Sequence, residues 1–129
     1  MPYRAAPNYN NVAGFTTLAT PPVCPRGIQY STYIEAASGK VYPDGTGFCV
    51  WEFNDLTEAQ YEAVLTALGL TTVASNVSAP VTIQTVTHDR SVFANYNATV
   101  VHKKGEDTEF ADNRFLSARF LFKQLEAVA

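Results

Sequence analysis

The sequence predicts a mainly β fold: an antiparallel β-sandwich or barrel with one flanking α-helix and an extended N-terminal arm. Three observations lead to this prediction. Polar and apolar residues alternate with a period of two in several separate stretches, a single stretch carries helix signals, and five of the seven prolines fall within the first 25 residues. The 129 residues suffice for one compact core. We therefore expect a Pro-rich arm at residues 1–26 and a β-sandwich domain at residues 27–129.

The expected arm, residues 1–26, is rich in proline, which fixes φ and removes a backbone hydrogen-bond donor. It carries only Arg4 and Arg26 as charged residues, yet it contains several large apolar side chains. Disordered segments usually show the opposite composition, with many charges and few aromatic residues. We expect the arm to dock on a neighbouring subunit, and the alternative is a tether folded over its own domain. The side chains expected to make these contacts are Tyr3, Tyr9, Phe15 and Leu18.

Regular alternation begins after the arm. Residues 28–34 alternate and predict a strand, residues 37–40 supply a turn, and residues 40–42 begin a returning strand. A stronger turn signal, Pro43-Asp44-Gly45-Thr46-Gly47, precedes the next strand at residues 48–53. One face of that strand carries Cys49, Trp51 and Phe53.

One α-helix is predicted at residues 57–68. Thr57-Glu58-Ala59-Gln60 fits a capping box, in which the Thr hydroxyl and the Gln side chain each bind a free backbone N–H. Gly69 is the expected C-terminal cap, since glycine readily adopts the left-handed conformation that ends helices. The buried stripe of this helix is formed by Tyr61, Val64, Leu65 and Leu68.

Three further strands are expected at residues 80–87, 91–101 and 114–125, which gives a six-stranded fold with the helix between its third and fourth strands. Residues 102–114 hold seven of the 21 charged residues and are expected to form a solvated loop with a turn at Gly105. The last strand is expected to point four side chains inward, those of Leu116, Ala118, Phe120 and Phe122.

Charge is scarce and unevenly placed. Asp, Glu, Lys and Arg make up 16% of the chain, against roughly 25% in ordinary soluble domains, and residues 63–88 contain none. We expect neighbouring subunits to cover part of this surface. The net charge of −3 and the absence of a basic cluster argue against a protein that grips nucleic-acid phosphates. No apolar run is long enough for a membrane span, and no signal-peptide pattern is present.

No residue pattern indicates catalysis or a bound cofactor. His88-Asp89 and Ser91 lie in one turn, where three side chains cannot take up the separate roles of a catalytic triad. Cys49 has no neighbour in sequence that would stabilise a thiolate. His102 precedes Glu106, Asp107 and Glu109, but the spacing of a calcium loop is absent, so we expect a solvated charged loop. The sequence thus predicts a protein that is not an enzyme and holds neither metal nor cofactor.

A series of short motifs has a distinctive order. A W-x-F strand leads into an LT-x-x-Q helix start, and "IxT" and "Y-x-A" strands follow. In this order and over residues 39–126 the chain resembles small tail proteins of long-tailed bacteriophages. It departs from their pattern at Gln84, where a basic residue is expected, and in having one arginine, Arg119, in the segment Phe115–Leu125, where relatives often have several. The motifs are Gly39–Gly45, Cys49–Phe53, Leu56–Tyr61, Val81–Thr85, Asn95–Ala98 and Phe115–Leu125.

The resemblance implies a tail-tube-like fold that assembles into rings around a channel through which genomic DNA passes, without catalytic residues. A mildly acidic chain suits such a conduit, because it repels phosphate. We expect a structural virion protein, assembled in the host cytoplasm, whose partners are further copies of itself and other tail proteins. Besides the arm, one or both of the loops at residues 42–47 and 102–114 are expected to make subunit contacts. The candidate residues in these loops are Tyr42, Asp44, Lys103, Lys104, Glu106 and Asp107.

Two alternative functions fit the same sequence features. A capsid decoration or cement protein would use the arm to clamp onto capsid subunits. A glycan-binding β-sandwich module would use Trp51 and the tyrosines as stacking platforms.

Overall fold

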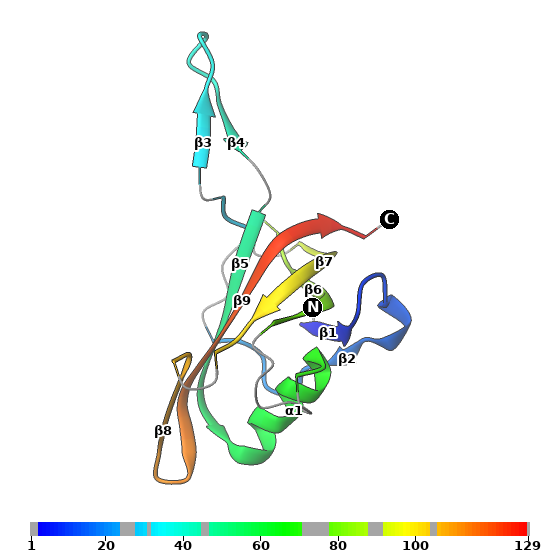
Figure 1. Cartoon of the computed structure of the whole chain (residues 1–129), viewed down its shortest axis with the longest axis vertical. Helices are drawn as coiled ribbons and strands as arrows, with labels where there is room; N and C mark the ends of the chain where they lie inside the picture. Colours follow the sequence, from blue (N-terminus) through cyan, green and yellow to red (C-terminus); the bar gives the residue numbers. More distant parts are fainter. Residues whose placement is uncertain are drawn as a thin grey trace.

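The computed structural model describes residues 3–23, 28–30, 32–44, 47–70, 78–87, 92–103 and 106–128. The described residues form a mainly β fold, with 57% of them in strands, one α-helix and a curled antiparallel sheet, which confirms the predicted fold class (Figure 1). In chain order the elements are β1 (Arg4–Pro7), the short 3-10 helix η1 (Val12–Gly14), β2 (Thr16–Thr17), β3 (Thr32–Glu35), β4 (Val41–Asp44), β5 (Gly47–Thr57), α1 (Glu58–Leu68), β6 (Ser78–Val86), β7 (Phe93–Val101), β8 (Thr108–Ala111) and β9 (Arg114–Ala127).

The main sheet has the strand order β2-β1-β6-β7-β9-β5, and β8 pairs with the first part of β9. All of these pairings are antiparallel. The helix α1 packs against β1, β5 and β9. Strands β3 and β4 form a separate two-stranded hairpin, which extends from the sheet at one end of the long axis, whereas α1 and β8 lie at the other end (Figure 1).

The core lies between the curled sheet and the helix. The predicted face of Cys49, Trp51 and Phe53 is buried, as are Phe120 and Phe122 on the neighbouring strand β9. Trp51 packs against Phe122 with ring centroids 4.6 Å apart, and Phe53 packs edge-on against Phe120 at 5.7 Å. These aromatic contacts across the β5–β9 pair form the centre of the domain.

Strand β9 does not alternate along its whole length. Gln124, with φ of 56°, is an extra residue relative to both β5 and β7, so Phe122 and Leu125 both face the core although they are three positions apart. The prediction that Leu116 points inward was wrong. Leu116 is 43% exposed, because it is an extra residue relative to β8 and is turned out of the ladder.

Helix α1 is confirmed with its predicted ends. The Thr57 hydroxyl accepts the Gln60 backbone N–H at 3.2 Å, and the Gln60 side chain accepts the Thr57 N–H at 2.9 Å, so the capping box is complete. Gly69 ends the helix with φ of 72°, as predicted. A Cβ atom at Gly69 would lie 3.1 Å from the Cβ of Pro7, which shows how closely the end of β1 approaches the helix.

The extended N-terminal arm is not confirmed. Residues 4–7 form β1, which pairs with β6 from Arg4↔Gln84 to Pro7↔Val81, and Tyr3 packs edge-on against Trp51 at 5.6 Å. Pro7 does not interrupt this pairing, because it is the last residue of the strand and only its own backbone N–H is missing. The predicted boundary at residue 26 lies outside the described residues.

Two predicted segments differ in extent. Of the strand expected at residues 28–34, the described residues 28–30 form an isolated bridge, Gln29↔Phe48, and β3 begins at Thr32. The solvated loop expected at residues 102–114 instead contains β8, joined to β9 by a two-residue turn. That turn is Asp112-Asn113, with φ values of 54° and 61°, the backbone that Asp and Asn tolerate in tight hairpins. Gly105 lies outside the described residues.

Candidate functional site

The β3–β4 hairpin exposes an unusual amount of apolar surface. Four of its large side chains, those of Tyr33, Ile34, Val41 and Tyr42, are 45–58% exposed. Its predicted turn is confirmed, since the Ala36 N–H donates to the Lys40 carbonyl at 2.8 Å. Within the described part of the chain, the hairpin pairs with no strand of the main sheet. The exposed side chains lie on both faces of the hairpin.

The register of the hairpin assigns its side chains to two faces. Paired residues of antiparallel strands lie on the same face, and here Glu35 pairs with Val41 while Ile34 pairs with Tyr42. Lys40 shares the face of Tyr42, because its Nζ atom lies 5.4 Å from the centroid of the Tyr42 ring. We call Ile34, Lys40 and Tyr42 the hairpin face. It combines two large apolar side chains with one positive charge.

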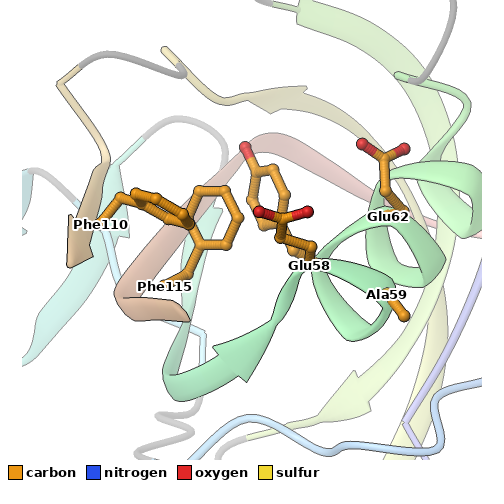
Figure 2. A pocket seen from close by; sticks show the side chains of 6 residues that line it. Glu58, Ala59, Glu62, Phe110 and Phe115 are labelled. Atoms are coloured by element: carbon orange, nitrogen blue, oxygen red, sulfur yellow. The ribbon is translucent and has the colours of Figure 1, made fainter. Parts of the chain in front are cut away.

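A groove of about 370 Å³ lies at the opposite end of the molecule, between α1 and the β8–β9 hairpin (Figure 2). We call it the α1–β8 groove. Phe115 stacks on Tyr61 with ring centroids 4.0 Å apart, and Phe110 meets Phe115 at 4.8 Å. The lining side chains are those of Glu58, Ala59, Tyr61, Glu62, Phe110 and Phe115.

The groove has a net negative charge. Glu58 and Glu62 are four positions apart, so they lie on the same side of α1, as Figure 2 shows. The nearby cation Arg114 is already paired with Asp55, with Nε 2.5 Å from Oδ1. Neither glutamate forms a salt bridge within the described part of the chain. An aromatic wall beside two carboxylates without a cationic partner is suited to a ligand that is both apolar and cationic.

His102 lies in the core, and the prediction that it belongs to a solvated loop was wrong. Its Nδ1 atom is 2.7 Å from the Arg119 carbonyl oxygen, and its Nε2 atom is 2.7 Å from the Tyr61 hydroxyl. Because a carbonyl can only accept, Nδ1 carries the proton, and Nε2 accepts from Tyr61. The ring also stacks on Phe120 at 4.1 Å. With both nitrogens engaged, His102 links α1 to the sheet and has no lone pair left for a metal.

A buried thiol and a buried phenol, those of Cys49 and Tyr61, predict a loss of stability at alkaline pH. Burial raises the pKa of the Cys49 thiol from 9.0 to about 12 and, with smaller effects of Glu62 and Asp107, that of Tyr61 from 10.0 to about 12. Since both groups lose their protons more readily in the unfolded chain, they stabilise the fold fully below pH 9.0 and lose that effect by about pH 12. We expect the denaturation midpoint to fall steadily across this range.

The alkaline prediction is checked by urea denaturation of the wild type and of Cys49→Ala at pH 8 to 11.5. The variant lacks the thiol, so its midpoint should fall less steeply than that of the wild type between pH 9 and 11.5. Equal slopes for the two proteins would contradict a raised pKa for Cys49.

The predicted arm contacts fall in different environments. Tyr3 and Leu18 are buried in the core of their own chain, so the prediction that they contact a neighbouring subunit does not hold for this conformation. Phe15 is half-buried, and Tyr9 is exposed, although its hydroxyl lies 3.3 Å from that of Thr99.

The structure describes some, but not all, of the loop residues that were predicted to make subunit contacts. Tyr42 is exposed on the hairpin face, whereas Lys104 and the side chain of Asp44 lie outside the described residues. Lys103 and Glu106 form an exposed ion pair at 3.8 Å. The Lys103 backbone N–H donates to Asp107 Oδ2 at 2.9 Å, so Asp107 stabilises the turn of its own loop.

Three other kinds of site were considered from the sequence: a glycan-binding platform, a catalytic triad and a metal site. Trp51 is fully buried, and its Nε1–H donates to the Thr85 hydroxyl at 3.1 Å, so it does not offer the stacking platform of a glycan-binding module. Residues 88–91 lie outside the described residues. No group of three or more His, Cys, Asp or Glu side chains in the described part of the chain is arranged to hold a metal ion.

No protein-family model matches the chain, and no significantly similar curated protein or solved structure was found. Among the described residues, no helix is both long and apolar enough to cross a membrane. The relation to phage tail proteins therefore rests on the sequence motifs alone.

Sequence reasoning missed most of the two exposed surfaces. It named Tyr42 on the hairpin but not Ile34 or Lys40, and it named no residue of the α1–β8 groove as a contact. The Asp112-Asn113 dipeptide, whose two residues tolerate positive φ, was the available signal for the β8–β9 hairpin. No signal in the sequence places Phe110 beside helix α1, since this contact depends on the tertiary fold.

Proposed function

We propose that this protein is a structural subunit of a bacteriophage tail, which assembles with copies of itself into rings in the tail tube or at one of its ends. Its other partners would be neighbouring tail proteins, and DNA would pass through the ring without specific binding. The motifs between residues 39 and 126 support the phage assignment. One structural observation supports self-assembly: the β3–β4 hairpin carries four exposed apolar side chains away from the rest of the chain (Figure 1).

The physical argument concerns the stability of the hairpin. A two-stranded hairpin alone is marginally stable in water, because it cannot bury its apolar side chains. Contiguous apolar patches on a protein surface mark sites where another molecule binds. A neighbouring subunit that covers Tyr33, Ile34, Val41 and Tyr42 would supply the missing contacts. The low charge content of 16% also suits a chain whose surface is partly covered by neighbours.

Self-assembly is tested by size-exclusion chromatography with light scattering over a series of concentrations. We expect the wild type to form multimers and the double variant Ile34→Ser/Tyr42→Ser to remain monomeric, because it loses apolar contact area on the hairpin. A matched control is Val12→Ser/Val92→Ser, which removes two similarly exposed apolar side chains outside the hairpin and should assemble like the wild type.

Negative-stain images of the wild-type multimers test the ring geometry. Rings or short tubes with a central opening would support a tail subunit. A wild type that remains monomeric at every concentration would contradict the proposal, and so would a hairpin variant that assembles as well as its control.

A further inference from the structure

The two exposed surfaces of the chain complement each other in chemistry. The hairpin face presents the apolar side chains of Ile34 and Tyr42 together with the positive charge of Lys40. The α1–β8 groove presents the aromatic side chains of Phe110 and Phe115 together with Glu58 and Glu62. The hairpin face therefore has a cation that could pair with the carboxylates of the groove, and the exposed apolar side chains of the two surfaces could cover each other.

The choice between the two hairpin faces follows from charge. Glu35 lies on the opposite face, paired with Val41, where it would be repelled by the carboxylates of the groove. Lys40 is held over the Tyr42 ring at 5.4 Å, so its ammonium group already lies on the side that carries Ile34. The register also places Asp44 on the hairpin face, at the end of β4 far from the turn and four residues from Lys40. Near the turn, this face is the one that brings a cation and an apolar surface to the groove together.

The positions of the two surfaces exclude a contact within one chain. The hairpin and the groove lie at opposite ends of the long axis (Figure 1), so a hairpin can reach a groove only on another molecule. Two different surfaces that bind each other form a heterologous contact, which leaves a free groove on one subunit of the pair and a free hairpin on the other. Such contacts repeat from subunit to subunit until a ring closes or a filament forms.

We propose that the hairpin face of one copy docks in the α1–β8 groove of the next copy, with the ammonium group of Lys40 beside the carboxylates of Glu58 and Glu62. This inference rests on the proposed self-assembly and specifies its contact. Phe110, which is 49% exposed in the single chain, becomes covered by Tyr42 and Ile34. The partner is thus a second copy of this chain and not an unrelated cationic protein.

Charge reversal tests the contact directly. The hairpin variant is Lys40→Glu, and the groove variant is Glu58→Gln/Glu62→Lys, which changes the groove from two negative charges to one positive charge. Each variant alone is expected to weaken association about tenfold or more, because it places like charges together or removes the attraction. The combination of both variants should recover most of the lost affinity. Lys123→Glu, an exposed position on β9, is the matched control and should associate like the wild type.

Association is measured by light scattering and sedimentation, and circular dichroism confirms that each variant is folded. If the wild type does not associate at all, the proposed function itself fails. If the wild type associates but either single-surface variant associates equally well, self-assembly stands and this contact is wrong. Weakened single-surface variants without recovery in the combination would also overturn the pairing of Lys40 with the groove.

Discussion

Deleting residues 1–7 is expected to unfold the protein and not merely to release it from a partner. The deletion removes the β1 strand, leaves the edge of β6 unpaired, and takes Tyr3, Ala5 and Ala6 out of the core. Tyr3 alone packs edge-on against Trp51 at 5.6 Å and against Phe93 at 5.0 Å. Removing one large aromatic side chain from a core costs about 3–5 kcal/mol, and domains of this size have about 5–15 kcal/mol in total.

The truncation is checked by urea denaturation and by the dispersion of amide signals in an NMR spectrum. We expect the truncated chain to show no cooperative transition and poor dispersion. The control is Val12→Ser, an exposed substitution in the same N-terminal segment, which should change the stability by about 0.5 kcal/mol or less. A truncated protein with a wild-type unfolding midpoint would show that residues 1–7 are an arm after all.

Replacing Trp51 with alanine is expected to cause the second large loss of stability. Trp51 is the largest side chain of the core and lies between Tyr3 and Phe122. Its removal leaves a cavity, and it also leaves the buried Thr85 hydroxyl without the indole N–H that lies 3.1 Å away. We expect a loss of about 3–5 kcal/mol from the cavity, with a further contribution from the unpaired hydroxyl.

Equilibrium denaturation of Trp51→Ala and of Leu116→Ala separates core packing from a general effect of truncating apolar side chains. Leu116 is 43% exposed, so its substitution should cost much less than that of Trp51. Equal losses for the two variants would contradict the assignment of Trp51 to the core. The same pair distinguishes a structural tryptophan from a binding platform, which would tolerate substitution without a loss of stability.

The parts of the fold that could be predicted from the sequence are those with local signals. Helix α1 is set by Thr57, Gln60 and Gly69, which lie within or next to the element they delimit. Alternation predicts the buried face of β5 from Cys49 to Phe53 and that of β9 from Ala118 to Phe122, but not the parts of β9 beyond its two extra residues. Strand β1 has no comparable signal, because Arg4–Pro7 has only four residues and its partner Gln84 lies far along the chain.

The exposed surfaces were harder to predict for a physical reason. Apolar residues at alternating positions indicate a strand, but alternation does not tell whether the strand joins the main sheet or projects from it. Ile34 was therefore placed in a predicted strand, but nothing in the pattern indicated that it would be about half exposed. His102 looked solvated because charged residues follow it, while its actual partners, Tyr61 and the Arg119 carbonyl, come from distant segments.

The position of β9 in the sheet has a consequence for the synthesis of the chain. Strand β9 pairs with β5, β7 and β8, and 70 residues separate the end of β5 at Thr57 from the end of β9 at Ala127. At about 5–20 residues per second, a ribosome needs roughly 4–14 s to cover that distance. During this interval the apolar face of Cys49, Trp51 and Phe53 has no partner strand. The unfinished chain therefore exposes an apolar surface that favours aggregation until β9 emerges and the sheet can close.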